Sequence, residues 1–151
     1  MKTIKCRCGK DIPVDDDVFD RLSDVTWRCG ATAVFQEGSR NTASMPHFII
    51  AVPPGFMPDH KDRDFHYCLR ANLRLATRSQ NAANSKKRSD NTTGYRGVSY
   101  STPTKNWEYR LTKDGKTFRY RGFATARDAA IAYNKKAKEV NGEFAYQNEI
   151  A

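Results

Sequence analysis

The stretch that decides the fold most clearly is Trp107-Glu108-Tyr109-Arg110-Leu111-Thr112-Lys113-Asp114-Gly115-Lys116-Thr117-Phe118-Arg119-Tyr120-Arg121. Apolar and polar side chains alternate on both sides of Asp114-Gly115, a period typical of half-buried strands. Asp-Gly is also a strong signal for a two-residue hairpin turn. The stretch therefore predicts an antiparallel hairpin with two chemically different faces. One face collects Trp107, Tyr109, Leu111, Phe118 and Tyr120, and the other collects Glu108, Arg110, Thr112, Arg119 and Arg121.

The flanks of this hairpin predict a third strand and a helix. The third strand is expected over residues 95–100, and a helix is expected to begin after Thr125 and to end at Asn141-Gly142. Small alanines on one helix face would let the helix lie close against the sheet. That face carries Ala126, Ala129, Ala130, Tyr133, Ala137 and Val140. We therefore expect a three-stranded antiparallel sheet packed on one helix.

The N-terminal part predicts short strands around one helix. The run Asp15-Asp16-Asp17 suits the start of a helix, and apolar residues follow at helical spacing. Residues 31–35 and Trp27 read as strands, with a turn at 37–39. Residues 45–52 predict a second apolar strand or a short helix, closed by Pro53-Pro54-Gly55. The apolar positions of the first helix are Val18, Phe19, Leu22 and Val25.

Residues 82–93 contain no large apolar side chain and form the best linker candidate. The sequence therefore predicts an α+β protein with domains at 1–84 and 94–151, joined by a basic linker at 85–93. The basic cluster in this linker would lie along a phosphate backbone. It consists of Lys86, Lys87 and Arg88.

The positive charge of the chain is unevenly distributed. The formal net charge is +9 and the pI is about 9.5, yet residues 1–58 hold seven basic and seven acidic side chains. Residues 59–88 hold eight basic against three acidic ones, and residues 92–127 hold eight against Glu108 and Asp114. This asymmetry favours a polyanion partner for the later part of the chain, although a basic surface kept for solubility would look the same.

Composition argues against a membrane protein or a secreted one. No apolar run approaches the roughly 20 residues of a membrane helix, and the N-terminus lacks a signal peptide's apolar stretch. We expect an intracellular protein with reduced thiols. The spacing of Cys6, Cys8, Cys29 and Cys68 argues against structural zinc, because Cys6-x-Cys8 is not the usual zinc-ribbon pair.

A candidate catalytic constellation lies in the C-terminal part of the first predicted domain. Asp59-His60 is followed twelve residues later by Asn72 and nine further on by Asn81, within a short helix capped by Thr77. Phosphodiester hydrolysis needs a base for water and a cation for the phosphate. A carboxylate with an amide oxygen suits Mg²⁺. Spacing alone does not exclude chance, and neighbours on a strand point in opposite directions unless the pleat bends.

Residues 12–84 resemble the HNH homing endonucleases of phages and introns, in the branch where asparagine replaces the last histidine. The resemblance runs through Asp11-Ile12-Pro13-Val14, Trp27, Met45-Pro46-His47, Pro53-Pro54-Gly55, Asp59-His60, Asn72-Leu73-Arg74 and Ser79-Gln80-Asn81. It implies a ββα-metal motif in which His60 is the general base and Asn72 braces the hairpin loop. It also implies Mg²⁺ or Mn²⁺ held by Asp59 and Asn81, with Asn84 as the alternative ligand.

One segment departs from the family pattern, and one histidine matches it. The family commonly has Asp-Asn shortly before Asn-Leu-Arg, whereas this chain has Tyr67-Cys68, so the loop from Lys61 to Leu69 is expected to differ in shape. His47 matches a frequent histidine of the family, and we interpret it as structural packing.

Residues 94–148 resemble the Apetala-two (ethylene-response-factor, AP2/ERF) DNA-binding domain of plants. The matching residues are Tyr95-Arg96-Gly97-Val98, Trp107, Gly122-Phe123-Ala124-Thr125, Asp128-Ala129-Ala130, Ala132-Tyr133, Gly142-Glu143-Phe144 and Asn148. The resemblance implies that the sheet enters the major groove of duplex DNA. It places Arg96, Trp107, Arg110, Thr112, Arg119 and Arg121 at DNA-contacting positions, with Arg121 beside a glycine shifted by one place.

These features favour a metal-dependent DNA endonuclease that binds duplex DNA through the sheet and cuts it at the HNH site. A monomer with one site would nick DNA, whereas a double-strand break would need a homodimer, even a weak one, or two events. One alternative is a DNA-binding or regulatory protein whose nuclease half is inactive. Another is a zinc-stabilised RNA-binding or interaction module built on the cysteines. If the chain is phage-encoded, it would act in the bacterial cytoplasm.

Overall fold

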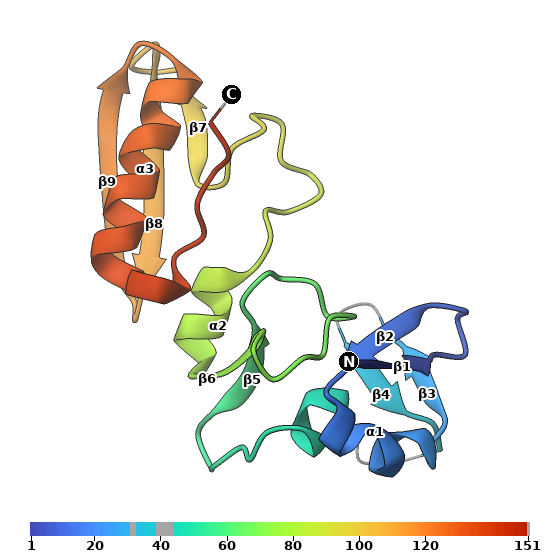
Figure 1. Cartoon of the computed structure of the whole chain (residues 1–151). Helices are drawn as coiled ribbons and strands as arrows, with labels where there is room; N and C mark the ends of the chain where they lie inside the picture. Colours follow the sequence, from blue (N-terminus) through green and yellow to red (C-terminus); the bar gives the residue numbers. More distant parts are fainter. Residues whose placement is uncertain (31–32, 39–43, 151) are drawn as a thin grey trace. The chain divides into compact units, whose positions relative to one another are not determined.

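In the computed structural model, residues 1–30, 33–38 and 44–150 are described. The chain divides into two compact units, Met1–Arg78 and Ser79–Ala151, each with a core of its own (Figure 1). The division follows Arg78, so most of the helix expected over 77–84 groups with the second unit. The role of residues 85–93 as a linker stays a prediction.

The first unit contains three two-stranded antiparallel sheets in its described residues. The first pairs β1 (Lys2–Lys5) with β2 (Asp11–Val14), and the second pairs β3 (Trp27–Cys29) with β4 (Val34–Gln36). The third pairs β5 (Met57–His60) with β6 (Leu73–Ala76). The helix α1 (Asp16–Ser23) and the 3₁₀ turn η1 (Met45–Phe48) lie between these strands in the sequence. Of the two structures predicted for residues 45–52, a strand or a short helix, the structure has the short helix.

Apolar side chains at alternate positions of the short strands build the core of the first unit. Ile12, Val14 and Trp27 are fully buried, and α1 adds Val18 and Leu22 at helical spacing. The predicted cap is wrong in detail. Asp15 stands at the N-cap but makes no side-chain cap, because its carboxylate accepts the backbone N–H of Arg70 at 2.7 Å. Residues 31, 32 and 39 of the predicted strand and turn lie outside the described residues.

The β5–β6 hairpin carries Asp59 and His60 at the end of its first strand. Along the chain it is followed by α2 (Arg78–Asn84), which begins directly after Thr77 as expected. The order strand, strand, helix therefore agrees with the prediction, and the metal-binding arrangement of these elements stays a prediction.

The second unit is built on the predicted three-stranded sheet. Its strands are β7 (Val98–Ser101), β8 (Asn106–Lys113) and β9 (Lys116–Phe123), in the order β7-β8-β9 and antiparallel throughout. Asp114 and Gly115 have φ of 49° and 77°, the two positive values that a type I′ turn requires. The long helix α3 (Ala126–Asn141) lies along one face of the sheet, and η2 (Gly142–Phe144) follows it (Figure 1).

Alanine spacing on α3 sets its close approach to the sheet. Ala129, Ala130 and Ala137 are buried beside Tyr133, and they pack against Val98 and Leu111 in two small clusters. The first strand begins three residues later than predicted. Gly97 has φ of +71°, and a Cβ there would lie 2.3 Å from the ring of Tyr133, so the chain bends at Gly97 before it can enter the sheet.

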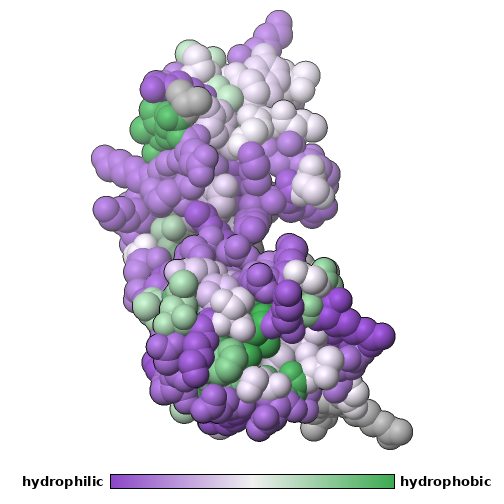
Figure 2. Space-filling view, turned by 45° about the vertical axis from the view of Figure 1, so that its right-hand side comes forward, coloured by the Kyte–Doolittle hydropathy of each residue, from purple (hydrophilic) through white to green (hydrophobic). Residues whose placement is uncertain are grey.

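The surface is mainly polar, in keeping with a mean hydropathy of −0.78. On the face drawn in Figure 2, hydrophilic side chains predominate and hydrophobic ones form small groups. Among the described residues, no helix has the length and apolar character needed to cross a bilayer.

Candidate active site and nucleic-acid interface

Asp59 occupies the centre of the β5–β6 hairpin. The antiparallel register places Arg74 directly opposite Asp59, and Arg74 Nε donates to Asp59 Oδ2 at 2.8 Å. Both side chains are largely shielded from water, with 6% of Asp59 and 11% of Arg74 exposed. This charge-assisted hydrogen bond fixes the direction of the shielded carboxylate.

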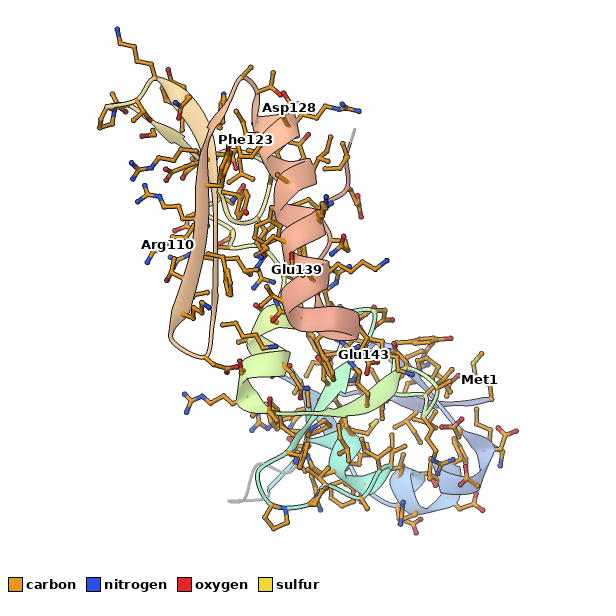
Figure 3. The ribbon with its side chains drawn as sticks, turned by 90° about the vertical axis from the view of Figure 1, so that its left-hand side faces the viewer. Met1, Arg110, Phe123, Asp128, Glu139 and Glu143 are labelled. Atoms are coloured by element: carbon orange, nitrogen blue, oxygen red, sulfur yellow. The ribbon has the colours of Figure 1, made fainter. Side chains whose placement is uncertain are left out.

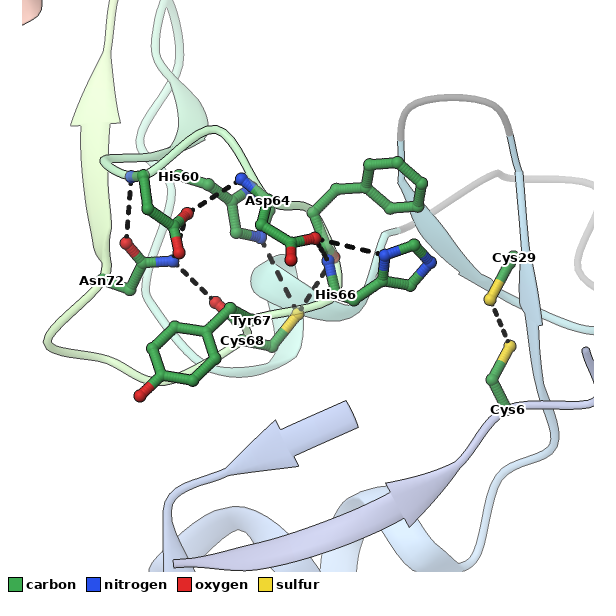
Figure 4. A network of polar contacts seen from close by, with 10 residues as sticks. Cys6, Cys29, His60, Asp64, His66, Tyr67, Cys68 and Asn72 are labelled. Atoms are coloured by element: carbon green, nitrogen blue, oxygen red, sulfur yellow. Dashed lines mark hydrogen bonds and ion pairs between the residues drawn. The ribbon is translucent and has the colours of Figure 1, made fainter. Parts of the chain in front are cut away.

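The long loop between β5 and β6 is organised by Asn72 (Figure 4). Its side-chain nitrogen donates to Asp62 Oδ1 and to the carbonyl of Tyr67, both at 2.8 Å, and its side-chain oxygen accepts the N–H of Asp62 at 3.2 Å. The backbone of Lys61 also donates to the carbonyl of Asn72 at 2.9 Å. Asn72 thus ties both ends and the middle of the loop together, and its part in catalysis stays a prediction.

His60 ends β5 and lies beside Cys68 of this loop. Its Nε2 is 3.7 Å from Cys68 Sγ, which also donates to the carbonyl of Phe65 at 3.6 Å (Figure 4). Burial lowers the pKa of His60 below its ordinary value of 6.5, against the opposing influence of nearby aspartates. Burial also raises the pKa of Cys68 to about 12. At neutral pH the pair is therefore a neutral imidazole beside a protonated thiol.

The predicted ligand Asn81 and its alternative Asn84 lie on α2, in the second unit. They stand three residues apart, which places them on one helix face. Asn84 is buried and Asn81 is half-buried. Asp59, His60 and Asn72 share one hairpin of the first unit, and the assignment of a ligand from α2 stays a prediction.

The face of the sheet opposite α3 is organised by Glu108, which is only 6% exposed. Arg119 Nη2 donates to both carboxylate oxygens of Glu108 at 2.7 Å, Arg121 Nε donates to Oε2 at 2.8 Å, and Ser99 Oγ donates to Oε1 at 3.2 Å. The hydrogen bonds from Arg119 lower the pKa of Glu108 below its ordinary 4.5, with Arg121 adding to the effect. The carboxylate thus holds two guanidinium groups in a fixed arrangement.

The predicted polar face is present in the sheet. Arg110 is exposed and extends away from α3 (Figure 3), and Thr112 Oγ1 lies 3.2 Å from Thr117 Oγ1 across the ladder. Arg121 stands two residues after Arg119 on β9, so strand alternation places both side chains on one face, as predicted. The register shift at Trp107/Glu108 falls beyond Arg121, at Gly122, and leaves this direction unchanged.

Two predicted DNA contacts have partners within the protein. Trp107 is half-buried, meets Tyr100 edge-on and packs against the cluster that contains Val98 and Ala129. Arg96 donates to the backbone carbonyls of residues 82, 83 and 85, and thereby binds the C-terminal end of α2. These contacts are structural, and DNA contact by either residue stays a prediction.

The basic cluster after α2 lines a polar hollow together with Arg96 and Gly97. Lys87 donates to the carbonyl of Gly94 at 2.8 Å, and Arg88 forms an ion pair with Asp90 at 2.8 Å. Lys86, Lys87 and Arg88 are all exposed.

The four cysteines separate into a group of three and a single residue. Cys6, Cys8 and Cys29 bring their sulfur atoms within 4.8 Å of one another, whereas Cys68 belongs to the His60 loop. The four-cysteine set considered from the sequence therefore does not form. The spacing argument against zinc missed the trio, because Cys29 comes from a separate hairpin.

Sequence reasoning assigned no role to Arg74 or Glu108. The available signal was the strand register, because an opposite charge directly across an antiparallel ladder predicts a pair. Asp59 faces Arg74, and Glu108 faces Arg121.

Comparisons with known proteins bear on this site. The chain is 36% identical over 99 residues to the "Uncharacterized HNH endonuclease L560" of Acanthamoeba polyphaga mimivirus, covering 66% of this chain and 50% of that protein. It is 32% identical over 94 residues to "Protein 3.8" of Escherichia phage T7, covering 62% of this chain and 77% of that protein. No family model matches the chain, and no solved structure matches it.

The chain spans about half the length of its mimivirus relative. It covers more than three quarters of the phage T7 protein at 32% identity. The chain therefore belongs to the same protein family as protein 3.8 of Escherichia phage T7, and its similarity to the mimivirus protein supports an HNH nuclease at family level.

Proposed function

We propose that the protein is a metal-dependent DNA endonuclease of the HNH type, which binds duplex DNA through the open face of β7-β8-β9 and cuts one strand. The observation that carries the proposal is the β5–β6 hairpin. In it a shielded carboxylate, Asp59, and a neutral, half-buried imidazole, His60, are adjacent, and Arg74 and Asn72 hold the surrounding structure.

His60 has the properties of a general base for water. A base must be unprotonated at working pH, and burial keeps the pKa of His60 below 6.5. The thiol of Cys68, 3.7 Å from Nε2, orients the ring in the place where the resemblance would put an asparagine. Because Cys68 remains protonated, it adds no charge beside the base.

Asp59 fits a hard divalent cation such as Mg²⁺ or Mn²⁺. Its donors are carboxylate oxygens, which such ions prefer. Asn81 is the proposed second ligand and Asn84 the alternative. When bound, the cation would stabilise the negative charge that develops on the phosphate. Asp59 would present its carboxylate to that ion, and the hydrogen bond from Arg74 fixes the direction of the carboxylate.

Duplex DNA is the proposed substrate because positive charge concentrates on one face of the sheet. Arg110, Arg119 and Arg121 share this face with Thr112, and Glu108 holds two of the arginines by hydrogen bonds. Fixed guanidinium groups suit bidentate contacts with guanine, whereas the exposed Lys86, Lys87 and Arg88 suit phosphates. One catalytic hairpin per chain predicts a nick from a monomer.

A DNA-binding protein without nuclease activity is a second candidate, favoured by one observation. Arg74 places a cation 2.8 Å from Asp59 within a shielded pair. A guanidinium that stays there would compete with a metal ion for the carboxylate.

Plasmid cleavage by the full chain distinguishes the two candidates. With Mg²⁺ or Mn²⁺, supercoiled plasmid should become open-circular, and EDTA should prevent this. His60→Ala should slow nicking by about 10²–10⁴-fold while its far-UV circular dichroism is unchanged. The matched control is His47→Ala, since His47 is exposed, not packed as expected from the sequence, and its Nδ1 lies 2.9 Å from Ser44 Oγ. If the His60 and His47 variants nick DNA at the same rate, His60 is not the base. If the wild type shows no metal-dependent nicking, the second candidate is favoured.

A further inference from the structure

The cysteine trio Cys6, Cys8 and Cys29 is independent of the hairpin that carries Asp59 and His60. Cys6 and Cys8 lie in the turn segment between β1 and β2, and Cys29 ends β3, so the three sulfur atoms come from two separate hairpins. All three lie within 4.8 Å of one another. We propose that these three thiolates bind a structural zinc ion that joins the two hairpins.

The backbone around the trio is shaped as a turn that presents sulfur atoms. Cys6 N donates to the carbonyl of Lys10 at 2.9 Å, and Gly9 N donates to the carbonyl of Cys6 at 2.8 Å. Arg7 N donates to the carbonyl of Trp27 at 2.8 Å, and Cys6 forms a parallel bridge with Trp27. The β1–β2 turn is therefore held against the end of β3, where Cys29 stands.

The distances agree with a tetrahedral zinc site after a small rearrangement. Zn–S bonds of about 2.3 Å at the tetrahedral angle place two sulfur atoms about 3.8 Å apart. The sulfur atoms of Cys6 and Cys29 are 2.7 Å apart, so binding would separate this pair by about 1 Å, which a change of side-chain rotamer supplies. Water or a further side chain completes the fourth position.

The surrounding charge favours a thiolate–metal centre. A zinc ion with three thiolates has a net charge of −1, and the basic residues Lys5, Arg7 and Lys10 alternate with the cysteines along the turn. Soft thiolate ligands select zinc over Mg²⁺, which prefers oxygen. This site and the proposed nuclease site would therefore take different ions.

The first unit also has a structural need for such a link. The strands of its first two sheets contain only four and three residues each, and strands this short bury little apolar surface. Cys8 is exposed, so burial of its side chain gives no reason for its position. A bound metal gives a direct one.

Metal analysis of the full chain tests the inference. The protein is purified in reducing buffer without chelators, and zinc and iron are measured by mass spectrometry on the folded fraction. We expect one zinc per chain and four free thiols after unfolding in EDTA. Absence of zinc, iron in place of zinc, or loss of two thiols to a disulfide would each overturn the proposal.

Substitution at Cys8 separates metal binding from packing, because Cys8 is exposed and its replacement leaves the core intact. Cys8→Ser should weaken zinc binding by at least about 10–100-fold, measured by competition with a chromogenic chelator. EDTA should lower the Tm of the wild type by roughly 4 °C or more and change that of Cys8→Ser much less.

The matched control is Cys68→Ser, which also removes one thiol but lies outside the trio. It should retain one zinc per chain. Equal zinc content in the Cys8 and Cys68 variants would overturn the assignment of ligands. Addition of Mg²⁺ after EDTA should restore the proposed nicking but not the Tm, so the two sites can fail independently.

Discussion

Asp59 and Glu108 are both nearly buried carboxylates on β-strands, and each accepts a hydrogen bond from an arginine directly across its antiparallel ladder. The arginines differ in exposure. Arg74 is 11% exposed, whereas Arg119 and Arg121 are 43% and 46% exposed. The first pair is therefore enclosed in its hairpin, whereas in the second a buried carboxylate supports guanidinium groups that face solvent. The same local chemistry can prepare an anion for a metal or cations for a polyanion, depending on which partner is exposed.

The largest expected effect separates the two carboxylates by function. Asp59→Asn should slow plasmid nicking by about 10²-fold or more, because it removes the charge proposed to hold the cation, while duplex binding persists. Glu108→Gln should instead weaken duplex binding and change the nicking rate at saturating protein much less. Nicking assays and gel shifts measure the two effects, with the exposed Asp20→Asn as control. Similar losses of nicking in both variants would contradict the different roles proposed for Asp59 and Glu108.

The β5–β6 loop should depend on a buried side chain in a way that the β7–β8 turn does not. Asn72→Ala removes three side-chain hydrogen bonds at a residue only 8% exposed, so we expect a loss of about 1–3 kcal/mol and a lower Tm. The control is Thr104→Ala in an exposed turn, where the change should stay within about 0.5 kcal/mol. Thermal unfolding measures both changes. Equal shifts in Tm for the two variants would show that Asn72 does not stabilise the loop.

The arginines on the polar face of the sheet should contact bases as well as phosphates. Arg119→Ala or Arg110→Ala should lose roughly 1–3 kcal/mol of discrimination at one base position, if the contact is bidentate. Competition binding with single-base variants of a selected duplex measures this. A uniform loss across sequences would mark a phosphate contact.

Acid should weaken the second unit through Glu108. Its pKa in the folded protein is lowered by Arg119, so its stabilising contribution is present above the ordinary value of 4.5 and is lost as the pH falls through the lowered pKa. The difference in Tm between the wild type and Glu108→Gln should therefore be large at neutral pH and should shrink below pH 4.5. If the Tm difference between the two proteins does not change with pH, the contribution of Glu108 comes from packing and not from its charge.

The smallest expected effect concerns the basic segment after α2. Lys86→Ala should weaken binding uniformly across sequences and lower the salt slope of the logarithm of the binding constant by about 1. Lys135→Ala, on the exposed side of α3, should leave the slope unchanged. Titrations at several salt concentrations compare the two, and equal slopes for both variants would remove Lys86 from the interface.

Local patterns predicted much of the second unit. The hairpin at Asp114-Gly115 and the helix ending at Asn141 follow from turn chemistry and alanine spacing, which act between near neighbours. The start of β7 was predicted too early, because the bend at Gly97 depends on contact with Tyr133, which lies far along the chain. In the candidate site, the spacing singled out Asp59, His60 and Asn72 but not Arg74.

The sequence by itself determined the periodic elements, the positive charge of the sheet and the order of the candidate site residues, because these depend on neighbours within a few positions. The tertiary structure decided which distant groups meet. Asp15 receives the backbone of Arg70 instead of capping its own helix, and Cys29 joins Cys6 and Cys8 from another hairpin. Such contacts depend on how short strands pack around a shared core, and residue spacing does not encode that packing.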